Sequence, residues 1–160
     1  EHIETLSFRM KKVGEEAFKT LPNVTVSEDE RHCLVITAPN ILQEPITTND
    51  AVNVLNENEF IWLGRIDNVI NSGGVKLFPE QIEEKLSHKI ERRFFIASQE
   101  SPELGEKLVL AVEGDPYIID EHAFGDLGKY ERPKVVLFIP KFLETPTGKV
   151  LRKESLKSVE

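Results

Sequence analysis

A change in the spacing of apolar residues divides this chain close to Arg65. From Val24 to Trp62 it consists of short β-branched runs separated by Asn, Asp, Glu and Pro, which favours a small antiparallel sheet or a fragment of a barrel. After Arg65, strand-like and helix-like runs alternate, as they do in a compact α/β unit. We therefore predict an α+β protein with a β-rich part over residues 1–66 and a smaller α/β domain over residues 67–160.

In the first part, the tetrapeptide Thr47-Thr48-Asn49-Asp50 ends a polar segment between two strand-like runs. Such a cluster is typical of an Asx turn or a helix N-cap, which is the structural alternative to a ligand-binding role for Asp50. Elements are expected here as strands over 23–26, 33–39, 51–55 and 60–64, with a polar loop over 40–50.

In the second part, Gly73-Gly74 lies between two apolar runs and predicts a hairpin turn, because glycine supplies the positive φ angles of tight turns. Pro79 suits the first turn of a helix, and Ile82, Leu86 and Ile90 share one face of it. The remaining elements are expected as strands over 92–98, 107–114 and 135–140, helices over 119–130 and 150–159, and a polar loop over 141–149.

Composition excludes several functional classes. The 160 residues carry 20 Lys and Arg against 28 Asp and Glu, a net charge of −8 that repels phosphate backbones, so we expect no nucleic-acid partner. No run reaches the 18 apolar residues of a membrane span. A single cysteine cannot form an internal disulfide, and the four histidines show no metal-ligand spacing, which favours a reducing, cytoplasmic setting.

The loop Thr145-Pro146-Thr147-Gly148-Lys149 is the segment with the most chemistry, because glycine lets a backbone approach a ligand and an ammonium attracts phosphate or carboxylate. It is not a Walker loop, since that motif needs glycine in place of Leu143 and a hydroxyl in place of Val150. Taken alone, Lys149 is interpreted at least as well as a surface lysine in a turn as it is as a ligand-binding residue. Similarly, Arg65 and Asp67 could face a sugar's hydroxyl groups or pair with other charges.

Three segments in this order resemble the last three blocks of the adenylate-forming superfamily of acyl-CoA synthetases, luciferases and peptide-synthetase adenylation domains. They are TTND at 47–50, GRIDNVINSGGVKLFPEQIE at 64–83 and TPTGKVLR at 145–152. Glu4-Thr5 also resembles the end of the family's Y-G-x-T-E-T block, although Ile3 replaces a threonine. The resemblance implies that this chain, which begins on a charged residue rather than Met, is the carboxy-terminal portion of a longer protein.

The resemblance implies a reaction in which a carboxylic acid and ATP form an acyl-adenylate, which coenzyme A then converts to a thioester. Asp50 and Arg65 would bind the ribose of ATP, and Lys149 would bridge the acid's carboxylate and the α-phosphate. Glu4 would be the glutamate associated with Mg²⁺. Without the amino-terminal region, this chain is expected to hold none of these ligands tightly and to be inactive, and a homo-oligomer is left open.

The resemblance also implies that the second domain swings between the two half-reactions about a hinge at Asp67. Gly73 and Gly74 would then face the pantetheine arm of coenzyme A. Lys76 stands where an arginine often meets coenzyme A, which keeps the charge without the bidentate geometry. Asn49 replaces a glycine that is common in the family.

Within the superfamily, the amino-acid sequences of several segments resemble those of the o-succinylbenzoate–CoA ligases of menaquinone biosynthesis. The segments are DERHCLVITAPN, ITTND, FIWLGRIDNVINSGGVKLFPEQIEEKL and RRFFIAS. The alternatives are a fatty or aryl acyl-CoA synthetase, or a stand-alone binding module that kept the motifs without the activity. Trp62 and Phe60 could stack on adenine, although alternating apolar residues in a strand are more often core.

Overall fold

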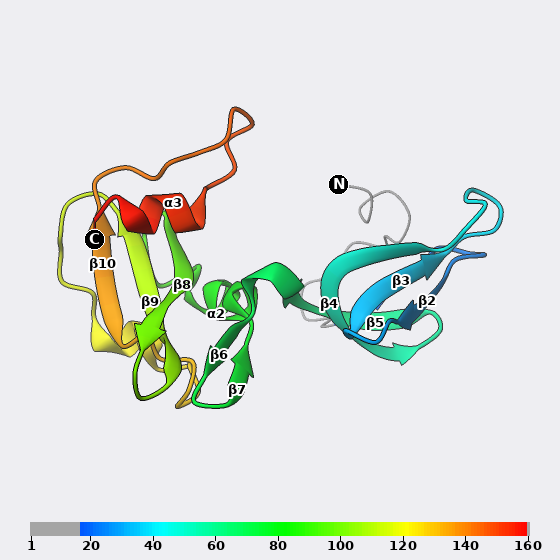
Figure 1. The fold of residues 1–160 in the computed structure, drawn as a ribbon, viewed down its shortest axis with the longest axis horizontal. Coiled ribbons are helices and arrows are strands. Elements are labelled where there is room, and N and C mark those ends of the chain that lie inside the picture. Colours follow the sequence, from blue (N-terminus) through cyan, green and yellow to red (C-terminus); the bar gives the residue numbers. More distant parts are fainter. Residues whose placement is uncertain (1–16, 160) are drawn as a thin grey trace. The chain divides into compact units, whose positions relative to one another are not determined.

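A computed structural model describes residues 17–159 and separates the chain into two compact units, the first ending at Asp67 and the second beginning at Asn68 (Figure 1). Each unit has its own five-stranded sheet, and helices are few. The predicted α+β class is confirmed.

The sheet of the first unit is antiparallel, with the strand order β1-β5-β4-β3-β2. Within residues 17–159 it stays open rather than closing into a barrel, because the outer strands β1 and β2 each pair on one side only. Its core is formed by one face of the sheet, where Phe18 stacks on Phe60 at 5.4 Å between ring centroids. The strands are β1 Phe18–Lys19, β2 Thr25–Glu28, β3 Cys33–Thr37, β4 Ile46–Asn56 and β5 Glu59–Arg65.

The polar loop predicted over 40–50 is wrong in its second half, because β4 begins at Ile46. Thr47 pairs with Val35 of β3 and Asp50 pairs with Arg65 of β5. Cross-strand pairing on both sides therefore overrides the local preference of Thr, Asn and Asp for turns. Asp50 is neither an N-cap nor part of an Asx turn between elements.

The second unit is a sheet between two helices. Its elements are β6 Ile70–Ser72, β7 Val75–Leu77, α2 Pro79–Leu86, β8 Phe94–Ser101, β9 Gly105–Glu113, β10 Val135–Ile139 and α3 Arg152–Lys157. Strand β9 is central, pairing with β8 and β6 in antiparallel and with β10 in parallel orientation. A short 3-10 helix, Ile66–Asn68, leads into this unit from the first.

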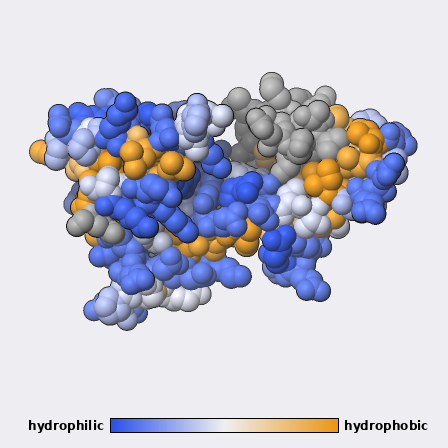
Figure 2. All heavy atoms as spheres, turned by 45° about the horizontal axis from the view of Figure 1, so that its top comes forward, coloured by the Kyte–Doolittle hydropathy of each residue, from blue (hydrophilic) through white to orange (hydrophobic). Residues whose placement is uncertain are grey.

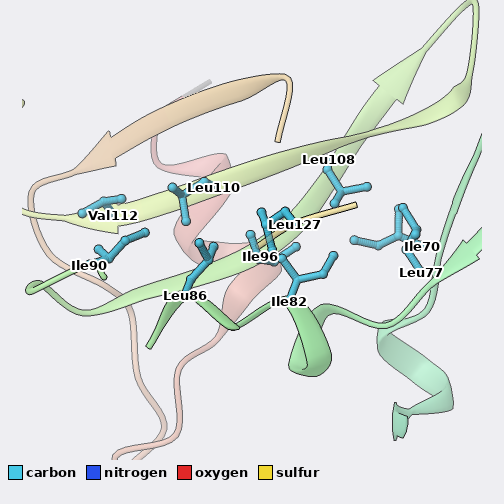
Figure 3. Packing of buried hydrophobic residues seen from close by; sticks show 10 residues of the cluster. All are labelled: Ile70, Leu77, Ile82, Leu86, Ile90, Ile96, Leu108, Leu110, Val112 and Leu127. Carbon is cyan, nitrogen blue, oxygen red and sulfur yellow. The ribbon is translucent and has the colours of Figure 1, made fainter. Parts of the chain in front are cut away.

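Strand β9 is buried on both faces, which explains its uninterrupted apolar run. Leu108, Leu110 and Val112 point toward α2, where they pack with Ile82 and Leu86 (Figure 3). The alternate residues of β9 pack in a second cluster with Leu156 of α3. Because successive side chains of a strand point to opposite faces, α2 and α3 cover opposite sides of the sheet.

Two helix predictions need correction. Helix α2 ends at Leu86, so Ile90 lies beyond it, although Ile90 is still buried in the same cluster. The helix predicted over 119–130 shrinks to the 3-10 helix Glu121–Phe124, because Gly125 and Gly128 follow within one turn. Pro79 does start α2 as predicted.

The face drawn in Figure 2 is mostly hydrophilic on both units, with apolar patches between the charged side chains. The large apolar side chains exposed on the described residues include Ile41 and Leu55 in the first unit and Ile118 and Leu143 in the second. None of the helices among residues 17–159 has the length and apolar character needed to cross a bilayer.

Candidate functional site

Asp50 is a buried carboxylate on β4, with 6% of its surface exposed. Its neighbour across the sheet is Arg65 on β5. The indole Nε1–H of Trp62, also on β5, donates to Asp50 Oδ1 at 3.2 Å, and the main-chain N–H of Asp50 donates to Thr48 Oγ1 at 3.1 Å. The carboxylate is therefore oriented by the indole on the adjacent strand, while the Thr48 hydroxyl binds the main chain of Asp50.

Arg31, for which the sequence predicted no role, connects this part of β4 to the turn before β3. Its guanidinium donates to Thr48 O at 3.1 Å and to Asn49 Oδ1 at 3.2 Å. Asp29 pairs with the same guanidinium and raises the pKa of Arg31 through that hydrogen bond. Seventeen residues separate Arg31 from Thr48, so sequence spacing offers no signal for this contact.

Arg65 and Asp67 pair with each other, at 3.4 Å between Nη2 and Oδ2, and both side chains are about half exposed. The same Asp67 oxygen accepts from Asn49 Nδ2 at 3.5 Å. The structure thus brings Asp50, Arg65 and Asp67 together at one edge of the first unit. Exposed ion pairs of this kind contribute at most about 1 kcal/mol, which leaves both side chains available to a ligand.

Gly73 and Gly74 form the turn between β6 and β7, confirming the predicted hairpin. Both have positive φ, 58° and 82°. A Cβ on Gly73 would approach Leu104 Cδ2 to 3.3 Å, and the N–H of Gly73 donates to Leu104 O at 2.9 Å. Around Gly74 the space is open. Lys76 lies exposed on β7.

Lys149 lies on an exposed hairpin that projects between β10 and α3. The turn is closed by Thr145, whose N–H donates to Lys149 O at 2.8 Å and whose hydroxyl accepts from the N–H of Lys149 at 3.0 Å. Gly148 has a φ of 81°, which this tight turn requires. The main chain of Lys149 is thus rigidly placed while its ammonium faces solvent.

The Lys149 hairpin and the Gly73-Gly74 turn lie at opposite ends of the second unit. Figure 1 shows the orange loop that carries Lys149 beyond one end of the sheet and the β6–β7 hairpin beyond the other. Both belong to one packed body, because the same β8–β9 pair supports them.

Metal binding finds no support in the described part of the chain, where no group of three or more His, Cys, Asp or Glu could hold an ion. The predicted glutamate Glu4 lies outside the described residues. Cys33 is buried on β3, and this burial raises the pKa of its thiol, so it is an inert core residue.

Sequence comparisons relate the chain to acyl-CoA synthetases. None of the known protein-family models matches it. The medium-chain acyl-CoA ligase Mig of Mycobacterium avium is 34% identical over 94 residues, which are 54% of this chain and 17% of that protein. The chain thus spans about a sixth of the length of this curated relative.

Structure comparisons lead to the same enzymes. An acyl-CoA synthetase (AMP-forming)/AMP-acid ligase II-like protein from Dyadobacter fermentans is 31% identical, covering 92% of this chain and 45% of its own, with a TM-score of 0.58. The o-succinylbenzoate CoA synthetase of Bacillus subtilis, solved with its acyl-adenylate, reaches a TM-score of 0.73 over 88% of this chain and 35% of its own, and at 18% identity it shows the fold alone. The homologues of this chain are acyl-CoA synthetases and AMP-forming ligases, which supports its place in the adenylate-forming superfamily.

Proposed function

We propose that this chain is the carboxy-terminal portion of an AMP-forming acyl-CoA ligase and that its second unit serves two half-reactions in turn. The observation that carries the proposal is the placement of the Lys149 hairpin and the Gly73-Gly74 turn at opposite ends of one packed unit. One orientation of such a unit presents only one of them to a given site. A rotation about Asp67, the last residue of the first unit, would exchange them.

In the first half-reaction, a carboxylate oxygen of the acid attacks the α-phosphorus of ATP, and pyrophosphate leaves. Lys149 would lie between the two reactants, where its fixed positive charge opposes the negative charge that develops on the phosphorus oxygens. The exposed ammonium on a rigid turn suits this role, because the charge is placed without a competing partner among the described residues.

Asp50 and Arg65 would bind the ribose of ATP. The buried Asp50 carboxylate already accepts the Trp62 N–H through Oδ1, which leaves Oδ2 to accept from a sugar hydroxyl. Arg65, its neighbour across the strands, would donate to the same sugar. ATP would bring Mg²⁺ with it, and the proposed contact of Glu4 with that ion lies outside the described residues.

In the second half-reaction, the thiol of coenzyme A attacks the acyl carbon of the adenylate, and AMP leaves. The open space beside Gly74 would admit the pantetheine arm, which a side chain there would obstruct. The exposed Lys76 on the following strand would attract the phosphates of coenzyme A.

For the acid, we propose o-succinylbenzoate, which makes the protein a ligase of menaquinone biosynthesis. The support is the resemblance of its motif segments to the o-succinylbenzoate–CoA ligases. The second candidate is a medium-chain fatty acid, which the 34% identity to the Mycobacterium avium ligase favours.

The test is AMP release by the full-length native protein, isolated from its source cells and measured first by intact mass. With ATP and coenzyme A, o-succinylbenzoate is expected to give a kcat/KM at least about 100-fold above octanoate or benzoate, because a buried polar group of the acid is recognised strongly. A preference for octanoate would favour the second candidate. A native chain of 160 residues without AMP release would refute the ligase and leave a binding module.

Replacing Trp62 with phenylalanine tests the ribose site. The change removes the N–H that orients Asp50, and hydrogen bonds to charged groups contribute about 1.5–3 kcal/mol, so the KM for ATP is expected to rise at least about tenfold. The KM for coenzyme A should not change. The same substitution in an Asp50→Ala background is the control, and it should then have little further effect. Equal rises in both backgrounds would contradict the role of the indole N–H.

A further inference from the structure

Arg152 and Glu83 form a two-pronged ion pair inside the second unit, between the first residue of α3 and the middle of α2. Arg152 Nη1 lies 2.9 Å from Glu83 Oε1, and Nη2 donates to Oε2 at 3.0 Å. Only 26% of the Arg152 side-chain surface and 20% of the Glu83 side-chain surface are exposed. Parallel bonds between a guanidinium and a carboxylate fix both direction and distance.

Both members of the pair also bind the main chain of Ile96 on β8. Glu83 Oε1 accepts from the N–H of Ile96 at 2.7 Å, and Arg152 Nη1 donates to its carbonyl oxygen at 3.1 Å. In the described part of the sheet, β8 pairs with β9 only, so these bonds satisfy the outer edge of the strand. The ion pair therefore joins α2, β8 and α3 at one point.

The base of the Lys149 hairpin is attached beside this point. Leu151, just before Arg152, donates its N–H to Leu143 O at 2.8 Å, and the N–H of Leu143 donates to the buried Ser155 hydroxyl of α3 at 2.9 Å. Both strands of the hairpin are thus attached at their base to α3. The Arg152 guanidinium also lies 5.8 Å from the centroid of the Phe95 ring on β8.

We propose that Arg152 is a positioning residue for Lys149, which it acts on by fixing the start of α3 to Glu83 and to Ile96. This proposal rests on the function proposed above. Lys149 precedes Arg152 by three residues. The hairpin is hydrogen-bonded along its length and exposed at its tip, so a displacement of its base would move Lys149 as well. A misplacement of about 1 Å can lower the rate about 100-fold.

Partial burial distinguishes this pair from a surface contact. Desolvation raises the pKa of the Glu83 carboxyl against the opposing effect of Arg152, so loss of the arginine would leave a carboxylate that prefers to be neutral and cannot hold α3. By contrast, Arg93 contacts Glu144 on the same hairpin from an exposed position, where solvent weakens the pair. We therefore assign the position of the hairpin to the partly buried pair of Arg152 and Glu83.

The experiment compares Arg152→Ala, Arg152→Lys and Lys153→Ala in the full-length native protein. Adenylate formation is followed by ATP–pyrophosphate exchange, and thioester formation is followed from a supplied acyl-adenylate and coenzyme A. Arg152→Ala is expected to lower kcat for adenylate formation about 100-fold with unchanged KM for ATP, because the lysine is displaced while the ribose site is intact. Thioester formation should fall less than about threefold. Arg152→Lys should recover part of the loss, and the exposed Lys153→Ala should match the native protein.

Equal losses in the two half-reactions would show a merely structural role and overturn the proposal, as would native adenylate formation by Arg152→Ala. If Arg152→Ala fails to fold, judged by circular dichroism, Glu83→Gln and Arg152→Lys carry the same test, and the same split between half-reactions is required of them. Lys149→Ala tests the proposed function separately. If Lys149→Ala leaves adenylate formation intact, the proposed function fails; if only the Arg152 and Glu83 variants do so, the positioning role fails.

Discussion

Replacing Lys149 with alanine in the full-length protein is expected to lower the rate of adenylate formation by about 1000-fold or more. A single preorganised group that stabilises developing charge is worth about 100- to 1000-fold in kcat, and Lys149 would also align the two reactants. Thioester formation from a supplied adenylate is expected to stay within about twofold of the native rate. The Lys149 hairpin and the Gly73-Gly74 turn lie at opposite ends of the second unit, so in the proposed mechanism the hairpin would be away from the site in this step. ATP–pyrophosphate exchange measures the first step, and consumption of the adenylate with coenzyme A measures the second.

Lys141→Ala provides the matched control for this variant. Lys141 is an exposed lysine in the same loop segment, eight residues before Lys149, so it tests whether loss of a positive charge from the loop is enough. It should leave both steps unchanged. Lys149→Arg should behave much like Lys149→Ala, because a planar guanidinium does not replace a compact ammonium between two ligands. Equal losses in both half-reactions for Lys149→Ala would refute the proposed division of labour.

Replacing Asp67 with proline is expected to produce the opposite split, with thioester formation falling by about 100-fold and adenylate formation largely retained. Proline holds φ near −65°, and it also restricts the preceding residue, so rotation at the boundary between the units would be blocked in one orientation. The same pair of half-reaction assays provides the measurement. The retained step identifies the orientation in which the variant is locked.

Asp67→Ala separates this backbone effect from the loss of a side chain. It removes the contacts of the carboxylate with Arg65 and Asn49 but leaves φ free. Because the contacts are exposed and long, both half-reactions should be close to native. Native thioester formation by Asp67→Pro would rule out a hinge at this residue.

Much of the fold follows from local pattern. The Gly73-Gly74 hairpin, the start of α2 at Pro79 and the buried strand β9 were all predictable, because each depends on a preference that acts within a few residues. Predictions were wrong where tertiary contacts competed with these preferences. The segment 46–50 is polar and turn-like in isolation, yet it is a strand because β3 and β5 pair with it on both sides.

In the candidate site, too, some residues were predicted from the sequence and others were found only in the structure. The resemblance of the motif segments to the adenylate-forming superfamily predicted Asp50, Arg65, Asp67, Gly73, Gly74, Lys76 and Lys149, whose roles remain predictions. It did not predict Arg31, and it weighed Trp62 only as a stacking or core residue. Both residues donate hydrogen bonds to side chains of β4 that are distant in the sequence. Arg31 donates to Asn49 from the turn before β3, and Trp62 donates to Asp50 from the neighbouring strand.

The sequence by itself determined most of the strand and helix pattern, the glycines of the tight turns and the chemical groups of the motifs, because these depend on backbone preference and on residue identity. Only the tertiary structure decided how those groups are held. Glu83 and Arg152 pair across 69 residues of sequence because helices pack on both faces of the β8–β9 sheet. The same packing places Lys149 and Gly74 at opposite ends of one unit. That packing depends on which apolar faces meet in space, which no local pattern specifies.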